Sequence, residues 1–101
     1  MNTTIKPTKT FQETLKYLGK DFSSKVIDGE LCGYIKINDC YDIEISGMNN
    51  NRVKNPNFTI YIWNIKNGMF IKEQKTVHSL PELKSSLASL IKQYSNEPDQ
   101  Q

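Results

Sequence analysis

Two segments of the chain repeat apolar residues at the spacing of an α-helix. In the first segment the apolar positions are separated by four, three and four residues, so they share one helical face. They are Phe11, Leu15, Leu18 and Phe22. Thr10 and Glu13 form a capping box ahead of this stripe, and Gly19 is a natural stop. The pattern predicts a helix that begins at Thr10 and ends near Gly19.

The second helical segment has the clearest boundary signal in the chain. Ser79 and Glu82 form a capping box, and Pro81 lies in the first turn, where a proline is well tolerated. The apolar stripe that follows consists of Leu80, Leu83, Leu87, Leu90, Ile91 and Tyr94. A helix capped by Ser79 is therefore predicted, and it ends before Pro98.

Between these helices, apolar and polar residues alternate with the period of two that marks β-strands. Four strands are predicted, at residues 31–37, 41–46, 58–65 and 69–75. Residues 25–28 lack a clear strand signal, and Asp28-Gly29 indicates a turn before the first strand. The irregular segment at residues 47–57 is predicted to be a surface loop.

The register of the first hairpin follows from its side-chain pattern. A two-residue turn would pair Ile35 with Asp42 and place apolar residues beside charges on the same face. A three-residue loop at residues 38–40 instead pairs Ile35 with Ile43 and keeps one continuous apolar face. We therefore expect the three-residue loop.

The last hairpin is predicted around Asn67-Gly68, a pair that is typical of tight turns. A two-residue turn there places Phe70 opposite Ile65. The same register mixes apolar and polar residues elsewhere, because it places Glu73 beside Ile62. The mismatch has to be relieved by a bulge, a longer turn or an edge position.

These elements predict an α+β domain with the order α-β-β-β-β-α. Two amphipathic helices need an apolar surface to cover, and one face of a four-stranded, mainly antiparallel sheet provides it. The expected fold is a two-layer sandwich with the N-terminal and the C-terminal helix packed on one face of the sheet. Residues 1–101 are expected to form a single globular domain, with flexible tails at residues 1–9 and 96–101.

Composition excludes some function classes without naming one. The formal net charge is +2, from twelve lysines, one arginine and eleven acidic residues. This is well short of the basic face of a dedicated nucleic-acid-binding protein. No apolar run is long enough to span a bilayer, and the first residues do not form a secretory signal, so we expect a cytoplasmic protein without membrane contact. The abundance of Asn, Ile and Lys suggests an AT-rich gene from a low-GC bacterium, phage or plasmid.

The residue inventory offers little chemistry. One histidine, His78, and two cysteines, Cys32 and Cys40, cannot furnish a structural zinc site. The three-residue loop also places Cys40 too far from Cys32 for a disulfide. We expect Asp42 and Glu44 to form a solvated strand face and not a catalytic pair. No catalytic residue, metal ligand or cofactor site is predicted, and no enzyme activity is expected.

The face of the sheet opposite the helices is the surface on which we expect a partner to bind. It gathers large aromatic and apolar side chains, and contiguous exposed apolar area usually marks a contact site. The predicted binding residues are Tyr34, Lys36, Tyr61, Trp63, Ile65 and Phe70 on the sheet, with Arg52 and Lys54 in the loop. The alternative is that a dimer partner or the N-terminal segment already covers this face.

Two function classes fit these features best. The first is a small protein that binds another protein, of the inhibitor, immunity or anti-defence type, because aromatic residues are common interface anchors. Self-association through the same face would make the chain a homodimer. The alternative is a single-stranded nucleic-acid-binding protein in which Tyr34, Tyr61 and Trp63 stack bases while lysines contact phosphates. The acidic residues Asp42 and Glu44 count against that alternative.

Overall fold

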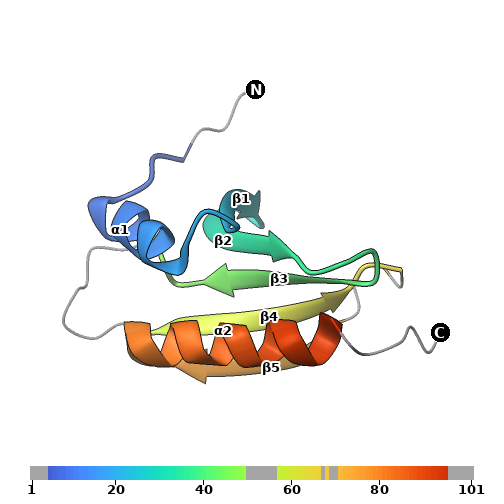
Figure 1. Cartoon of the computed structure of the whole chain (residues 1–101). Coiled ribbons are helices and arrows are strands. Elements are labelled where there is room, and N and C mark those ends of the chain that lie inside the picture. The colour runs from blue at the N-terminus through green and yellow to red at the C-terminus, as the bar shows by residue number, and fades with distance from the viewer. Residues whose placement is uncertain (1–4, 50–56, 67, 69–70, 96–101) are drawn as a thin grey trace.

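A computed structural model describes residues 5–49, 57–66, 68 and 71–95 of the chain. These residues form a five-stranded antiparallel sheet flanked by two helices (Figure 1). The elements are α1 (Lys9–Leu18), β1 (Ser23–Ile27), β2 (Glu30–Lys36), β3 (Tyr41–Ser46), β4 (Phe58–Asn64), β5 (Ile71–Val77) and α2 (Leu80–Ser95). Each strand pairs with the next along the chain, so the strand order is β1-β2-β3-β4-β5. The predicted α+β class is confirmed, but the prediction of four strands is wrong.

The additional strand is β1, at one edge of the sheet. It pairs with β2 through a hairpin in which Ile27 lies opposite Glu30. The two residues between them, Asp28 and Gly29, have φ angles of 52° and 80°, the left-handed values that a tight type I′ turn requires. The turn predicted at Asp28-Gly29 is therefore confirmed. The strand before it shows no apolar alternation because its first four residues are exposed and need not be apolar.

α1 begins earlier than the sequence pattern predicts. Thr8 is the N-cap residue, and its hydroxyl oxygen accepts a hydrogen bond from the backbone N–H of Phe11 at 3.0 Å. The predicted capping box that starts at Thr10 is therefore wrong. The predicted end is confirmed, because Gly19 has a φ of 116° and donates its backbone N–H to the carbonyl oxygen of Leu15.

α2 begins as the sequence predicts. The Ser79 hydroxyl oxygen accepts a hydrogen bond from the backbone N–H of Glu82 at 3.2 Å. The Glu82 carboxylate accepts one from the backbone N–H of His78, the residue before the cap. The buried side chains of the helix are Leu83, Ser86, Leu87, Leu90 and Tyr94. In the described part of the chain, no helix combines the length and apolarity needed to cross a membrane.

The predicted register of the β2–β3 hairpin is confirmed. Ile35 lies opposite Ile43, so the apolar side chains of the two strands share one face. The side chain of Asn38 closes the three-residue loop, since its carbonyl oxygen accepts hydrogen bonds from the backbone N–H groups of Cys40, at 2.8 Å, and Tyr41, at 3.0 Å. This local bonding favours a three-residue connection over a two-residue one.

The β4–β5 pair contains the irregularity that its sequence requires. The register shifts between Ile62 and Trp63, as in a β-bulge, and Glu73 lies opposite Ile62. Glu73 is accommodated there because its carboxylate accepts a hydrogen bond from the Tyr94 hydroxyl of α2 at 2.6 Å. A bulge is present, but it leaves Glu73 beside Ile62, and that pair is accommodated on the edge strand β5 by the Tyr94 hydrogen bond. Phe70, which the simple turn places opposite Ile65, lies outside the described residues.

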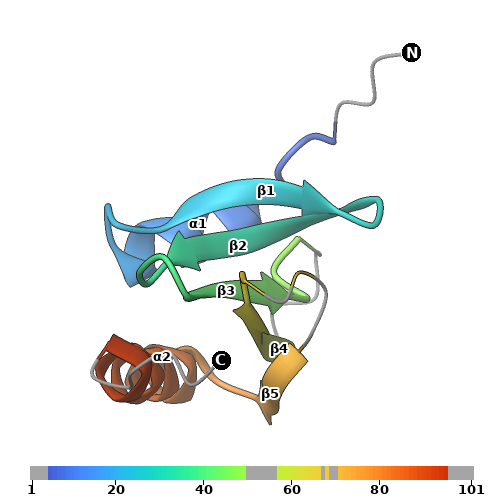
Figure 2. The same ribbon diagram turned by 90° about the vertical axis from the view of Figure 1, so that its right-hand side faces the viewer.

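One face of the sheet and both helices enclose a single core. Its buried members include Phe11 and Leu18 of α1, Ile43 and Ile45 of β3, Ile60 and Ile62 of β4, and Leu83, Leu87, Leu90 and Tyr94 of α2. Because side chains of both helices belong to the same cluster as these isoleucines, both helices cover the same face. They do so at different places, with α1 beside β1 and β2, and α2 beside β4 and β5 (Figure 2).

The end of β3 is tied to the start of α1. The side-chain oxygen of Asn49 accepts a hydrogen bond from the backbone N–H of Thr8 at 2.7 Å, and its amide nitrogen donates one to the carbonyl oxygen of Lys6 at 3.3 Å. Ile5 packs against the core. Residues 5–9, predicted as part of a tail, therefore contact the body of the domain. The remaining parts of the predicted tails, residues 1–4 and 96–101, lie outside the described residues.

Candidate partner-binding site

The outer face of the sheet carries the side chains that alternate with those of the core. Tyr34 lies opposite Glu44, which in turn lies opposite Tyr61, while Asp42 lies opposite Trp63. Since successive side chains of a strand point to opposite faces, all five point away from the helices. The register thus brings residues of β2, β3 and β4 together on the outer face.

The predicted binding residues divide into two groups. The described members are Tyr34, Lys36, Tyr61, Trp63 and Ile65. Lys36 is exposed, whereas the other four are half-buried. The side chains of this face are therefore less exposed than the alternating sequence pattern predicts. Arg52, Lys54 and Phe70 lie outside the described residues.

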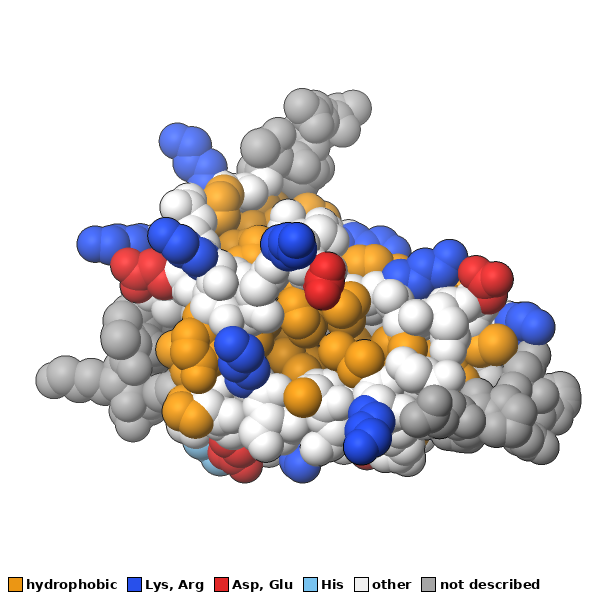
Figure 3. Space-filling view, viewed as in Figure 1, with side chains coloured by type: hydrophobic (Ala, Val, Ile, Leu, Met, Phe, Trp, Pro, Cys, Tyr) orange, Lys and Arg blue, Asp and Glu red, His pale blue; other side chains and the backbone are white. Residues whose placement is uncertain are grey.

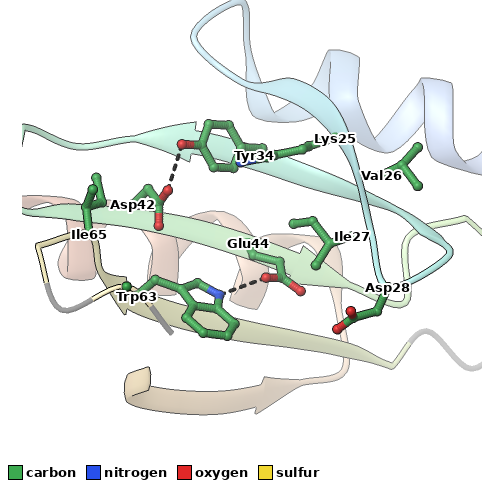
Figure 4. Close-up of a pocket in the computed structure, with 10 residues that line it drawn as sticks. Lys25, Val26, Ile27, Asp28, Tyr34, Asp42, Glu44, Trp63 and Ile65 are labelled. Carbon is green, nitrogen blue, oxygen red and sulfur yellow. Dashed lines mark hydrogen bonds between the residues drawn. The ribbon is translucent and has the colours of Figure 1, made fainter. Parts of the chain in front are cut away.

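A cavity of about 310 Å³ lies on the outer face, between the β1–β2 hairpin and the end of β4 (Figure 4). It is lined by Lys25, Val26, Ile27, Asp28, Tyr34, Asp42, Glu44, Trp63, Ile65 and Gly68. Tyr34, Trp63 and Ile65 are the predicted binding residues that it brings together. Residues 25–28 were missing from the prediction because they belong to the unpredicted strand and its turn. The Asp28-Gly29 turn is the signal that could have revealed the hairpin.

Glu44 is the most enclosed acidic side chain of this cavity. Its Oε1 accepts a hydrogen bond from the indole N–H of Trp63 at 2.7 Å, and the residue is only 8% exposed. Burial raises the pKa of the Glu44 carboxyl above its usual value. The Trp63 hydrogen bond lowers this pKa, whereas the nearby carboxylates of Asp28, Glu30 and Asp42 raise it. The prediction of a solvated acidic face is therefore wrong for Glu44.

Tyr34 and Asp42 form a second polar pair in the cavity. The Tyr34 hydroxyl donates a hydrogen bond to Oδ2 of Asp42 at 2.7 Å. Burial, together with this bond and the charge of Asp42, raises the pKa of Tyr34 to about 12. The ammonium nitrogen of Lys25 lies 4.6 Å from the centroid of the Tyr34 ring, within cation–π distance. These contacts hold the ring in place at the side of the cavity.

Two further residues of this face have structural roles. The Glu30 carboxylate accepts hydrogen bonds from the Ser46 hydroxyl, at 2.9 Å, and from the backbone N–H of Gly47, at 2.8 Å. Cys32 is 0% exposed, and burial raises the pKa of its thiol to about 12, so the thiol stays protonated at neutral pH. Cys32 and Cys40 are both free, in agreement with the prediction.

The cavity is equipped to bind, and the chemistry of its lining favours cations. Its polar side-chain groups, among the described residues, are the three carboxylates of Asp28, Asp42 and Glu44, the Tyr34 hydroxyl, the Trp63 indole N–H and the ammonium group of Lys25. Aromatic faces and carboxylates both attract positive charge. Within the described ranges, no group of three or more His, Cys, Asp or Glu side chains is placed to hold a metal ion.

A second hollow lies on the helical side of the sheet. Figure 3 shows hydrophobic side chains at the surface between α1 and α2. The hollow there has a volume of about 500 Å³ and is lined by Asp21, Ser23, Tyr34, Ile35, Lys36, Ile37 and Ile91. Ile35, Ile37 and Ile91 are only partly buried and pack against the core. The sequence pattern assigns these residues to the core and does not show that the helices leave them partly uncovered.

Comparison of the chain with protein-family models, with curated proteins and with solved structures finds no match.

Proposed function

We infer that the chain is a small cytoplasmic binding protein that acts on another protein through the outer face of its sheet, without catalysis. The observation that supports this function is the cavity beside Trp63 and Tyr34. Interface anchors commonly insert into recesses of this kind, and aromatic residues are enriched where binding energy is concentrated. The function then belongs with inhibitors, immunity proteins and anti-defence proteins, which act by occupying a surface of their target.

The alternative of single-stranded nucleic-acid binding has less support. Asp28, Asp42 and Glu44 line the same cavity as Tyr34 and Trp63, two of the three aromatic residues that would stack bases. Phosphates that approach this face would meet carboxylates, although binding to nucleic-acid backbones is driven by positive charge. We therefore favour a protein partner.

Site-specific photo-crosslinking tests the proposed function. Tyr61 is half-buried on the outer face, next to the cavity, and Tyr17 is 40% exposed on α1. We replace each in turn with p-benzoyl-L-phenylalanine, irradiate cells that produce the protein, and identify adducts by mass spectrometry. The expected result is one discrete protein adduct from position 61 and none of that mass from position 17. Excess unlabelled wild-type protein should compete it away.

Other adduct patterns contradict the proposal. Equal adducts from both positions would show that contacts are made without preference for the outer face. Adducts composed only of a second copy of the chain would show that this face serves self-association. Adducts composed of nucleic acid would favour the alternative function.

A further inference from the structure

The cavity on the outer face has an excess of negative charge. Among the described residues of the lining, Asp28, Asp42 and Glu44 contribute three carboxylates and Lys25 contributes one ammonium group. This ammonium group lies over the Tyr34 ring. A cavity with this balance attracts a cation and repels an anion, most strongly where the surroundings exclude water.

The second oxygen of Glu44 strengthens this argument. Glu44 is 8% exposed, and its Oε1 is occupied by the Trp63 indole N–H. In the described residues, the hydrogen-bond donor to Oε2 is the Cys32 thiol, a weak donor at the long distance of 4.0 Å. A buried carboxylate oxygen with such a weak partner has capacity for a strong donor. A cationic N–H group supplies the strongest bond of this kind.

The aromatic side chains distinguish between cations. Trp63 and Tyr34 both line the cavity, and the close-up places the indole and Glu44 side by side (Figure 4). A guanidinium group is planar, so it can stack on an aromatic face and direct its N–H groups at carboxylates in its own plane. An ammonium group can do only part of this. The lining therefore suits arginine better than lysine.

The edge strand indicates how such a side chain would arrive. β1 is at the edge of the sheet, and residues 25–28, from β1 and its turn, line the cavity. An edge strand presents backbone N–H and C=O groups on its outer side, and an extended segment can pair with them. A segment paired in this way can place one of its side chains in the cavity.

We propose that the cavity receives an arginine side chain from an extended basic segment of a partner protein. This proposal rests on the function inferred above and names the chemistry of the partner. The guanidinium group stacks on the Trp63 indole and donates hydrogen bonds to Glu44 and to the neighbouring carboxylates. The backbone of the segment pairs with β1.

Defined peptides test this proposal by NMR on the whole chain. The probe is acetyl-Thr-Val-Arg-Val-Thr-amide, and the matched control carries citrulline, which has nearly the same shape without the charge, in place of arginine. Trp63 is the single tryptophan of the chain, so its indole N–H resonance is unambiguous. We expect the arginine peptide to shift this resonance saturably and to bind at least about tenfold more tightly than the citrulline peptide, as expected for a charge-assisted hydrogen bond. Affinity should fall with added salt.

Two substitutions assign the binding to the cavity. Glu44→Gln keeps an acceptor for the Trp63 N–H and removes the charge, and it should weaken the arginine peptide about tenfold. Asp28→Asn tests the same attraction at an exposed turn position that tolerates asparagine, and it should weaken binding in the same direction. Glu13→Gln, the same change in net charge at an exposed position of α1, should leave the affinity unchanged.

Three results would overturn the proposal. The first is equal affinity for the arginine and citrulline peptides. The second is equal loss in Glu44→Gln and Glu13→Gln, which would show that the attraction depends only on net charge. The third is binding of spermidine as tightly as the peptide, which would make the cavity a site for small amines. The crosslinking experiment at position 61 does not depend on the peptide measurements. If a protein adduct still forms while one of these three results is obtained, the arginine proposal is wrong but the proposed protein-binding function is not.

Discussion

Glu44 affects both the stability of the fold and the charge of the cavity on the outer face of the sheet. A carboxylate that is 8% exposed carries a large desolvation cost unless it is hydrogen-bonded or paired. The Trp63 indole offsets part of that cost, at an N···O distance of 2.7 Å. The net effect is still a raised pKa, because burial outweighs the indole and the nearby carboxylates add to it. The ionised residue therefore weakens the fold while it prepares the cavity for a cation.

The raised pKa of Glu44 predicts a pH-dependent difference between the wild type and Glu44→Gln. A carboxyl group whose folded pKa lies above its unfolded value of about 4.5 binds its proton more tightly in the native state. Its contribution to stability is greatest below the unfolded pKa and is lost as the pH rises through the folded pKa. The free energy of unfolding of the wild type, relative to Glu44→Gln, should therefore fall as the pH rises above the unfolded value of about 4.5.

Urea denaturation at several pH values, from below that unfolded value up to neutral pH, measures that difference. Glu13→Gln makes the same chemical change at an exposed position of α1 and serves as the reference. A wild-type to Glu44→Gln difference that stays constant, or that rises with pH, would contradict the assignment of Glu44 as a destabilised buried carboxylate.

At the level of elements, the sequence predicts the apolar strands and the helices well. It predicts the exposed strand β1 and the contacts of polar side chains poorly. The Ile35 and Ile43 pairing is predictable because a shift by one residue would bury charges. β1 is not predictable in this way, because its first four residues are exposed and no core demands a pattern from them. The cavity cannot be predicted from the sequence for the same reason, since residues 25–28 of β1 and its turn help to line it. The aromatic residues of the site could be found from alternation, but the enclosure of Glu44 depends on contacts between strands.

The start of α1 provides a direct test of which threonine caps the helix. Thr8 accepts the Phe11 N–H, whereas Thr10 lies within the helix. Thr8→Ala should therefore destabilise the protein by about 1 kcal/mol, the usual cost of losing an N-cap side chain. Thr10→Ala should change stability by less than about 0.5 kcal/mol.

Thermal and urea unfolding of the two variants give this comparison with the same chemical change in both. A larger loss in Thr10→Ala would restore the capping box that the sequence indicates. Equal losses would show that neither hydroxyl has the capping role assigned here.

At the level of the whole molecule, the net charge of the chain is positive whereas the charge of the cavity lining is negative. The chain has a net charge of +2 and a pI near 8.5, a weak positive bias that allows only non-specific attraction to phosphates. The described lining of the cavity beside the aromatic residues nevertheless has three carboxylates against one ammonium group. The charge of the cavity lining is therefore opposite in sign to the net charge of the chain.

This difference in sign predicts how the chain behaves toward a single-stranded oligonucleotide. Non-specific attraction between lysines and phosphates is strongest at low salt, so a weak mobility shift at an ionic strength of about 0.01 M is compatible with the structure. Such a shift should be the same in the wild type and in Trp63→Ala, because we expect the carboxylates of Asp42 and Glu44 to repel the phosphates of any base that would stack there. Tyr17→Ala, at an exposed aromatic position on α1, is the reference. Loss of binding in Trp63→Ala, with retention in Tyr17→Ala, would show that the aromatic face binds nucleic acid and that the preference for a cationic partner is wrong.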